Sequence, residues 1–153
     1  MPGGGRIVEI TRQADYAVRI VLDLAGHDGS GVLRSDDVAR RQLVPRAYFT
    51  KVVQALVRAG FVRTLRGARG GIQLAKDPAH ITLRQVIEAI EGPVRLNRCL
   101  LVPGECALER TCAAHPVWEH LQDVLMREMD AVTVSQMAAA KPRAARQAKR
   151  RAS

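Results

Sequence analysis

The chain has 153 residues, which is enough for one domain of ordinary size and a small appendage. Hydrophobic residues make up 47% of it and charged residues 25%, a composition that excludes a disordered or fibrous protein. The 24 Lys and Arg residues outnumber the 15 Asp and Glu residues, and the net charge of +9 favours an anionic partner, nucleic acid before membrane.

Three helices are predicted in the first 60 residues. Apolar residues recur at helical spacing over Thr11–Gly26, with a threonine to cap the start and a glycine to end it. A short helix is expected over Ser35–Leu43, capped by its serine, and a third over Pro45–Gly60. The last two are joined by a tight turn, as in a helix-turn-helix.

A β-hairpin is predicted next. Two short strand patterns, Phe61–Leu65 and Ile72–Ala75, flank the Gly-rich connection Arg66–Gly71. Because a strand rather than a helix follows these glycines, and no Lys-Ser or Lys-Thr, a nucleotide-binding loop is rejected. The order of elements predicts a mainly α fold with a small β-hairpin, a winged helix-turn-helix over residues 10–80.

The side chains of this region fit duplex DNA. An aromatic content of 3% is too low for platforms that stack single-stranded bases. Any surface helix carries charge opposite its core face, so charge alone does not indicate DNA binding. The helix over Pro45–Gly60, however, occupies the position in the element order at which a recognition helix enters the major groove. The candidate DNA-binding residues are cationic or hydrogen-bonding: Ser35, Arg46, Tyr48, Thr50, Lys51 and Gln54 on the helices, and Arg66 and Arg69 at the hairpin tip.

A second unit is expected over residues 81–140. Thr82 caps a helix that ends at Gly92-Pro93, and a long loop over residues 94–113 has no clean period. Pro116 opens a long helix whose apolar face is too extensive for one small domain to cover, which predicts a homodimer that pairs through this helix. Residues 1–9 are expected to be a flexible N-terminus, and residues 141–153 a basic, disordered tail.

The long loop contains every cysteine of the chain. Cys99, Cys106 and Cys112 form the pattern C-x6-C-x5-C, and His115 follows. Thiolates and imidazole are ligands for zinc and for iron-sulfur clusters, so the spacing predicts a metal site. Structural zinc sites usually contain a pair of ligands two to four residues apart, and Cys99 with Cys106 is wider, so a larger iron-sulfur cluster fits at least as well. The alternative is three unrelated small apolar residues and a surface histidine.

The chain resembles the Rrf-type family of winged-helix bacterial transcription regulators, which includes IscR-like and NsrR-like iron-sulfur proteins. The likeness covers about residues 7–138. It implies a homodimer that binds operator DNA in a manner dependent on an iron-sulfur cluster. The residues that carry it are Ile10-Thr11, Asp15-Tyr16-Ala17-Val18, Ala39–Tyr48, Leu56, Ala59-Gly60, Arg66-Gly67, Gly70-Gly71, Leu74-Ala75, the three cysteines and Trp118.

The same resemblance offers two candidates for the fourth ligand. His115 looks like the IscR arrangement, which holds a 2Fe-2S cluster. Asp15 on the first helix occupies the place that, in NsrR, reaches a 4Fe-4S cluster from the partner subunit. The histidine, and with it the 2Fe-2S cluster, is favoured because it lies close in sequence to the cysteines and needs no second chain.

The sequence therefore predicts an iron-sulfur-dependent DNA-binding transcriptional regulator that senses iron-sulfur status, redox state or nitric oxide, with repression the favoured direction. It is not expected to be an enzyme, since no carboxylate or oxyanion signal accompanies the cysteines. The alternative is a zinc-bound Cys3His nucleic-acid-binding protein without a sensing role. A cytoplasmic location is expected, because no run of 18 apolar residues and no signal-peptide pattern is present.

Overall fold

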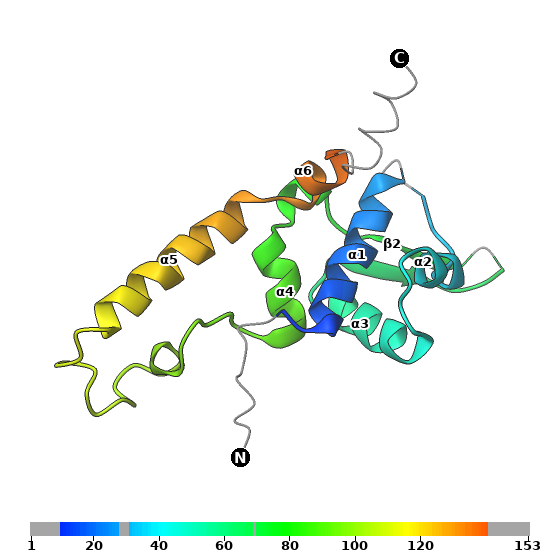
Figure 1. The fold of residues 1–153 in the computed structure, drawn as a ribbon. Helices are drawn as coiled ribbons and strands as arrows, with labels where there is room; N and C mark the ends of the chain where they lie inside the picture. Colours follow the sequence, from blue (N-terminus) through cyan, green and yellow to red (C-terminus); the bar gives the residue numbers. More distant parts are fainter. Residues whose placement is uncertain (1–9, 28–30, 69, 141–153) are drawn as a thin grey trace, which may run out of the picture.

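A computed structural model describes residues 10–27, 31–68 and 70–140. Figure 1 shows a head built from the first helices and the hairpin, from which one long helix extends as an arm. None of the described helices is long and apolar enough to cross a membrane. The elements are α1 (Arg12–Gly26), α2 (Ser35–Arg41), α3 (Arg46–Arg58), β1 (Val62–Leu65), β2 (Gly71–Leu74), η1 (Pro78–His80), α4 (Leu83–Glu91), η2 (Arg98–Leu100), α5 (His115–Ala131) and α6 (Val134–Ala139).

The helices begin near the capping residues that the sequence indicates, with one exception. The hydroxyl of Thr11 accepts a hydrogen bond from the amide of Ala14 and so caps α1. Ser35 does not cap α2: it is the first helical residue, and Arg34 stands at the cap position without a side-chain bond. The two aspartates that follow Ser35 lie in the first turn of α2, where the helix dipole favours negative charge.

The hairpin forms the expected wing and has an additional neighbour. β1 and β2 pair antiparallel, with Val62 opposite Leu74. Leu33, which precedes α2, forms a bridge to Ile72 through hydrogen bonds of 2.9 and 2.8 Å in the two directions. A Cβ atom at Gly71 would collide with the carbonyl oxygen of Leu33, so this close approach requires glycine.

One apolar core fills the head and extends beyond the hairpin. It takes residues from all three N-terminal helices and from both strands, and Ile81, Val86 of α4 and Val134 of α6 belong to the same cluster. The fully buried members include Ile20, Leu56 and Ile72. Because α4 and α6 contribute to this core, the base of the arm is packed against the head.

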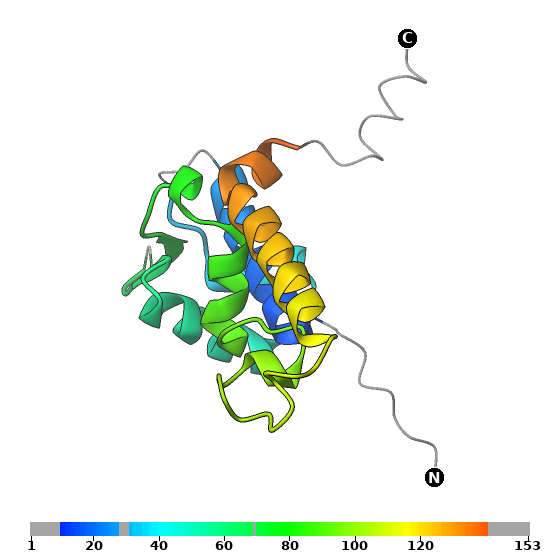
Figure 2. The ribbon, with the colours of Figure 1, turned by 90° about the vertical axis from the view of Figure 1, so that its left-hand side faces the viewer.

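Two backbone hydrogen bonds join the base of the arm to the head. The amide of Leu83 donates to the carbonyl of Val132 at 2.9 Å, and the amide of Val134 donates to the carbonyl of Ile81 at 2.8 Å. The starts of α4 and α6 are therefore side by side, and each carries a capping box, Thr82 with Gln85 and Thr133 with Gln136. Figure 2 views the molecule from the side of the arm, with α5 in front, and Figure 1 shows α5 diverging from α4 as it leaves this junction.

One residue of the helix-turn-helix has an unfavourable backbone conformation. Leu43, between α2 and α3, has φ of 53° and a relative exposure of 78%. A leucine in this left-handed region loses about 1 kcal/mol, whereas asparagine tolerates it. Because Leu43 packs against little, Leu43→Asn is expected to raise the free energy of unfolding by about 0.5–1 kcal/mol in urea denaturation.

The matched control is Leu108→Asn, at another exposed leucine, which has no positive φ. It should leave the free energy of unfolding unchanged. Equal effects of the two variants would show that the backbone conformation of Leu43 is not the cause.

Candidate functional site

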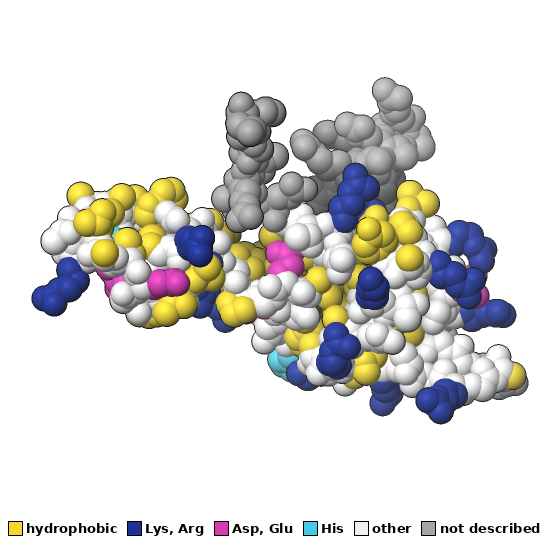
Figure 3. All heavy atoms as spheres, turned by 90° about the horizontal axis from the view of Figure 1, so that it is seen from below, with side chains coloured by type: hydrophobic (Ala, Val, Ile, Leu, Met, Phe, Trp, Pro, Cys, Tyr) yellow, Lys and Arg dark blue, Asp and Glu magenta, His cyan; other side chains and the backbone are white. Residues whose placement is uncertain are grey.

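The exposed face of α3 carries the side chains predicted to contact DNA. Its opposite face, Phe49, Val52, Val53 and Leu56, is buried in the head. Figure 3 shows Lys and Arg side chains distributed over the head. The exposed residues of α3 that the sequence singles out are Arg46, Tyr48, Thr50, Lys51 and Gln54.

Two of these side chains have partners within the protein. The guanidinium of Arg46 lies 3.5 Å from a carboxylate oxygen of Asp36, in an exposed pair that a DNA phosphate could replace. The ring of Tyr48 packs against that of Tyr16 on α1, with centroids 5.9 Å apart. Tyr48 therefore helps to hold α3 against α1 as well as facing outward, a packing role that its sequence position alone does not reveal.

The remaining predicted DNA contacts lie beside α3 and on the wing. Ser35 is half-buried at the start of α2. Arg66 is exposed in the turn between β1 and β2. Arg69 lies outside the described residues.

An ion pair that the sequence analysis did not anticipate fixes the helix-turn-helix to α1. Asp23 of α1 accepts hydrogen bonds from Nε of Arg41 and, at 2.7 Å, from its Nη2. Only 7% of the Asp23 side chain is exposed. These hydrogen bonds raise the pKa of Arg41 above its usual value, against the opposing effect of burial, so the guanidinium remains charged. The pair ties the end of α2 to α1.

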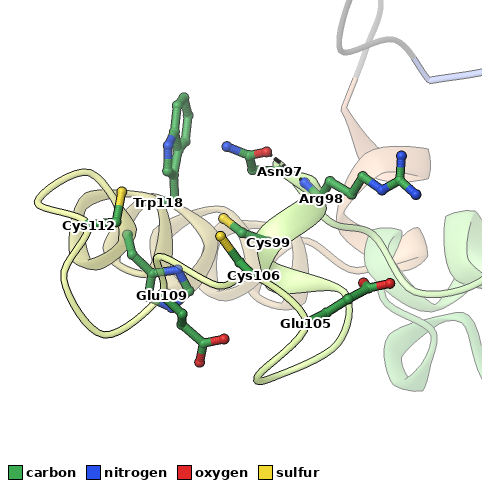
Figure 4. Close-up of a pocket in the computed structure, with 9 residues that line it drawn as sticks. Asn97, Arg98, Cys99, Glu105, Cys106, Glu109, Cys112 and Trp118 are labelled. Carbon is green, nitrogen blue, oxygen red and sulfur yellow. Dashed lines mark hydrogen bonds between the residues drawn. The ribbon is translucent and has the colours of Figure 1, made fainter.

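The loop between α4 and α5 forms a pocket of about 490 Å³ at the outer end of the arm. All three cysteines and His115 line it, together with Asn97, Arg98, Glu105, Glu109 and Trp118. In Figure 4 the sulfur atoms of Cys99 and Cys106 lie on one side of the pocket, and Cys112 and Trp118 lie further along it. The loop therefore brings the four predicted ligands to one cavity.

The donors share this pocket without converging on a point. Among the described residues, no three His, Cys, Asp or Glu side chains are close enough together to hold a metal ion. The three thiols are half-buried and unpaired with one another. His115 is largely enclosed, with Nε2 at 3.4 Å from a carboxylate oxygen of Glu119. Three soft thiols and one imidazole in a single cavity are a donor set that suits an iron-sulfur cluster.

Asp15, the alternative fourth ligand, lies on α1 and does not line this pocket. Its carboxylate pairs with Nη2 of Arg19 at 2.5 Å. The other terminal nitrogen of Arg19 donates to the carbonyl of Gln42 in the helix-turn-helix at 3.4 Å. Within one chain, Asp15 is thus linked through Arg19 to Gln42 of the helix-turn-helix.

These features define a winged helix-turn-helix protein that carries a cysteine pocket on a protruding arm. The model of the Rrf2 family, described as iron-dependent transcriptional regulator, matches residues 10–140. The chain therefore belongs to the Rrf2 family and is a DNA-binding transcriptional regulator.

Curated relatives agree with this assignment. The HTH-type transcriptional regulator NsrR of Geobacillus kaustophilus is 29% identical over 131 residues, which cover 85% of this chain and 89% of that protein. The HTH-type transcriptional regulator IscR of Cronobacter sakazakii is 30% identical over 130 residues, 85% of this chain and 80% of that protein.

Solved structures share the fold. CymR (YrzC), described as the global cysteine regulator of B. subtilis, aligns with a TM-score of 0.72 and 25% identity over 89% of this chain and all of that one. IscR of T. potens aligns with a TM-score of 0.68 and 26% identity over 84% and 85% of the two chains. Regulators with different names share this fold, so the fold alone does not identify the signal that a regulator senses.

The ion pair at α1 gives a prediction. Asp23→Asn removes the charge that accepts the Arg41 hydrogen bonds, and because Asp23 is buried we expect the free energy of unfolding to fall by about 1–2 kcal/mol. The control is Asp37→Asn, which breaks the exposed pair with Arg40 and should change stability by less than about 0.5 kcal/mol. Thermal or urea unfolding measures both, and a smaller loss in Asp23→Asn than in Asp37→Asn would contradict the prediction.

Proposed function

We propose that this regulator binds DNA in a manner that depends on an iron-sulfur cluster held in the loop of the arm. The observation that carries the proposal is that Cys99, Cys106, Cys112 and His115 line one pocket, although the cysteines are separated by six and by five intervening residues in a loop without strands. A cluster held there would supply iron chemistry that responds to redox state or to nitric oxide. The sensed signal is thus iron-sulfur status, redox state or nitric oxide.

His115 is our choice for the fourth ligand, with a 2Fe-2S cluster. It lines the pocket together with the cysteines, whereas Asp15 is paired with Arg19 on α1. Glu119, one turn along α5, lies beside Nε2 of His115 and can orient the ring, as carboxylates do for metal-binding histidines. The ring then presents Nδ1 for ligation.

The arm also supplies the surface for a homodimer. Val117, Trp118 and Leu121 on the outer half of α5 are exposed at 55%, 37% and 43%. A row of apolar side chains of this kind is more stable when covered, and a second copy of the same helix covers it symmetrically. Two heads held in this way would meet operator half-sites about 34 Å apart.

The chain's own residues then connect the pocket to DNA binding. Ligation by the cysteines and His115 orders the loop, whose C-terminal end is the start of α5. α5 in turn determines how the two heads are placed relative to each other. A change in the loop would tilt the recognition helices toward or away from neighbouring half-sites, and repression is the favoured result of binding.

The ligand assignment gives a prediction. Protein purified without oxygen should be coloured and contain iron and acid-labile sulfide, and Cys106→Ser should lose both because a thiolate ligand is removed. His115→Ala should lower cluster content strongly, and Asp15→Ala should leave it close to wild type. Absorbance spectra with iron and sulfide analysis measure these effects.

Colourless, zinc-containing protein would instead support a structural Cys3His site. Loss of the cluster in Asp15→Ala, with retention in His115→Ala, would exchange the two ligand assignments. Operator affinity that is the same with and without cluster would refute the sensing function.

The DNA-binding face gives a second prediction. Lys51→Ala on α3 and Arg66→Ala on the wing should each weaken operator binding and reduce the slope of log K against log salt by about 1, the effect of one lost phosphate contact. Gln54→Ala should instead reduce discrimination between operator and unrelated DNA. Fluorescence anisotropy at several salt concentrations measures both quantities. The control is Arg127→Ala, at an exposed arginine of α5 outside both the head and the cysteine loop, and a similar loss there would argue against the assigned face.

A further inference from the structure

Gln122 is a polar residue that the arm buries. It lies in the middle of α5, with a relative exposure of 8%, and faces the segment that leaves α4. A glutamine in the middle of an arm helix would ordinarily be solvated, and its burial requires that its amide be fully hydrogen-bonded.

The amide of Gln122 binds the backbone at the start of the cysteine loop. Its oxygen accepts from the amide of Leu96 at 2.9 Å, and its nitrogen donates to the carbonyl of Val94 at 2.8 Å. The side chain thus supplies the donor and acceptor that a neighbouring strand would supply. Glu88 of α4 accepts from the amide of Val94 at 3.1 Å, so this short segment is held from both helices.

Arg95 extends this connection to the turn that carries the first cysteine. Its Nη1 donates to the carbonyl of Val94 at 2.9 Å, and its Nε donates to the carbonyl of Leu100 at 3.2 Å. Leu100 belongs to η2, as does Cys99. A continuous path of hydrogen bonds therefore runs from Gln122 through Val94 and Arg95 to this turn.

The other two cysteines are held by bonds within the loop. The amide of Gly104 donates to Glu109 at 2.6 Å, and the amide of Cys112 donates to the carbonyl of Leu108 at 2.7 Å. His115, by contrast, is the first residue of α5 itself. One helix therefore carries the last predicted ligand directly and holds the first one through Gln122.

We propose that Gln122 is a positioning residue of the cysteine pocket, which sets the turn of Cys99 relative to His115 before any metal binds. The proposal rests on the function proposed above. Fixing both ends of the ligand-bearing segment to one helix lowers the conformational entropy that ligation would otherwise remove. Cys106 and Cys112, on the intervening turns, would supply the other two thiolates.

The test compares wild type with Gln122→Met, which keeps the length of the side chain and removes both hydrogen bonds. The first measurement is the rate at which iodoacetamide alkylates each cysteine in the reduced, metal-free full-length protein, resolved by mass spectrometry. We expect Cys99 to react about fivefold faster in the variant, because its turn opens more often, and Cys112 to react at the wild-type rate. The second is the rate at which a chelator bleaches the cluster of anaerobically loaded protein, which should also rise about fivefold.

Two further variants separate positioning from general stability. Gln122→Glu keeps the acceptor for Leu96 but sets a carboxylate oxygen against the carbonyl of Val94, so it should also speed the alkylation of Cys99, and it serves if Gln122→Met does not fold. Met129→Ala loosens the apolar cluster that α5 shares with α4 while leaving both hydrogen bonds of Gln122 in place, and should leave the alkylation of Cys99 unchanged relative to Cys112.

Each outcome is decisive. An unchanged rate for Cys99 in Gln122→Met, or the same selective increase in Met129→Ala, would overturn the proposal. Faster alkylation with unchanged bleaching would show that the contact does not serve the metal site and would also overturn it. If wild type binds no cluster at all, the proposed function fails, while the alkylation rates still decide whether Gln122 positions Cys99.

Discussion

Two backbone hydrogen bonds between residues 81–83 and 132–134 hold the arm to the head, and the placement of one relative to the other depends on them. They fix the base of α5 to the start of α4, and the helix cannot change direction without breaking them or moving α4. The contact of Arg84 with Asp130, at 2.9 Å, reinforces the same junction. Since α4 shares the core of the head through Val86, a force applied at the far end of the arm is transmitted to the packing around α1 and α3.

The cysteine pocket lies at the opposite end of the same helix, and this separation suits a regulator. The loop is built from turns and exposed apolar residues such as Leu101 and Leu108, so its order can change without disturbing the head. The proposed DNA-binding face, in contrast, is anchored by the Asp23–Arg41 pair and by the packing of Tyr48 on Tyr16. Under the proposed function, α5 joins the loop to the head, so a change in the loop would reach DNA through this one helix.

The elements that sequence could predict are those with strong local signals. Helical spacing and the threonines at positions 11 and 82 locate two helix starts, and the four ligand candidates are recognisable from residue type alone. What sequence could not give depends on tertiary contacts. The bridge of Leu33 to Ile72 and the burial of Asp23 arise only when distant segments meet. In the sequence Gln122 looks like any solvated helix residue, because its burial depends on the loop segment that packs against it. Ser35, expected as the cap of α2, is its first helical residue, since only one residue separates capping from helical geometry.

The uneven distribution of charge has a consequence for how the molecule meets DNA. Residues 1–80 carry 13 basic and 7 acidic side chains, whereas residues 81–140 carry 5 and 8. The chain is thus an electric dipole, and the field of a duplex turns it so that the wing leads and the arm trails. Encounters therefore begin in a nearly productive orientation, with the loop of the arm on the side of the molecule away from the duplex.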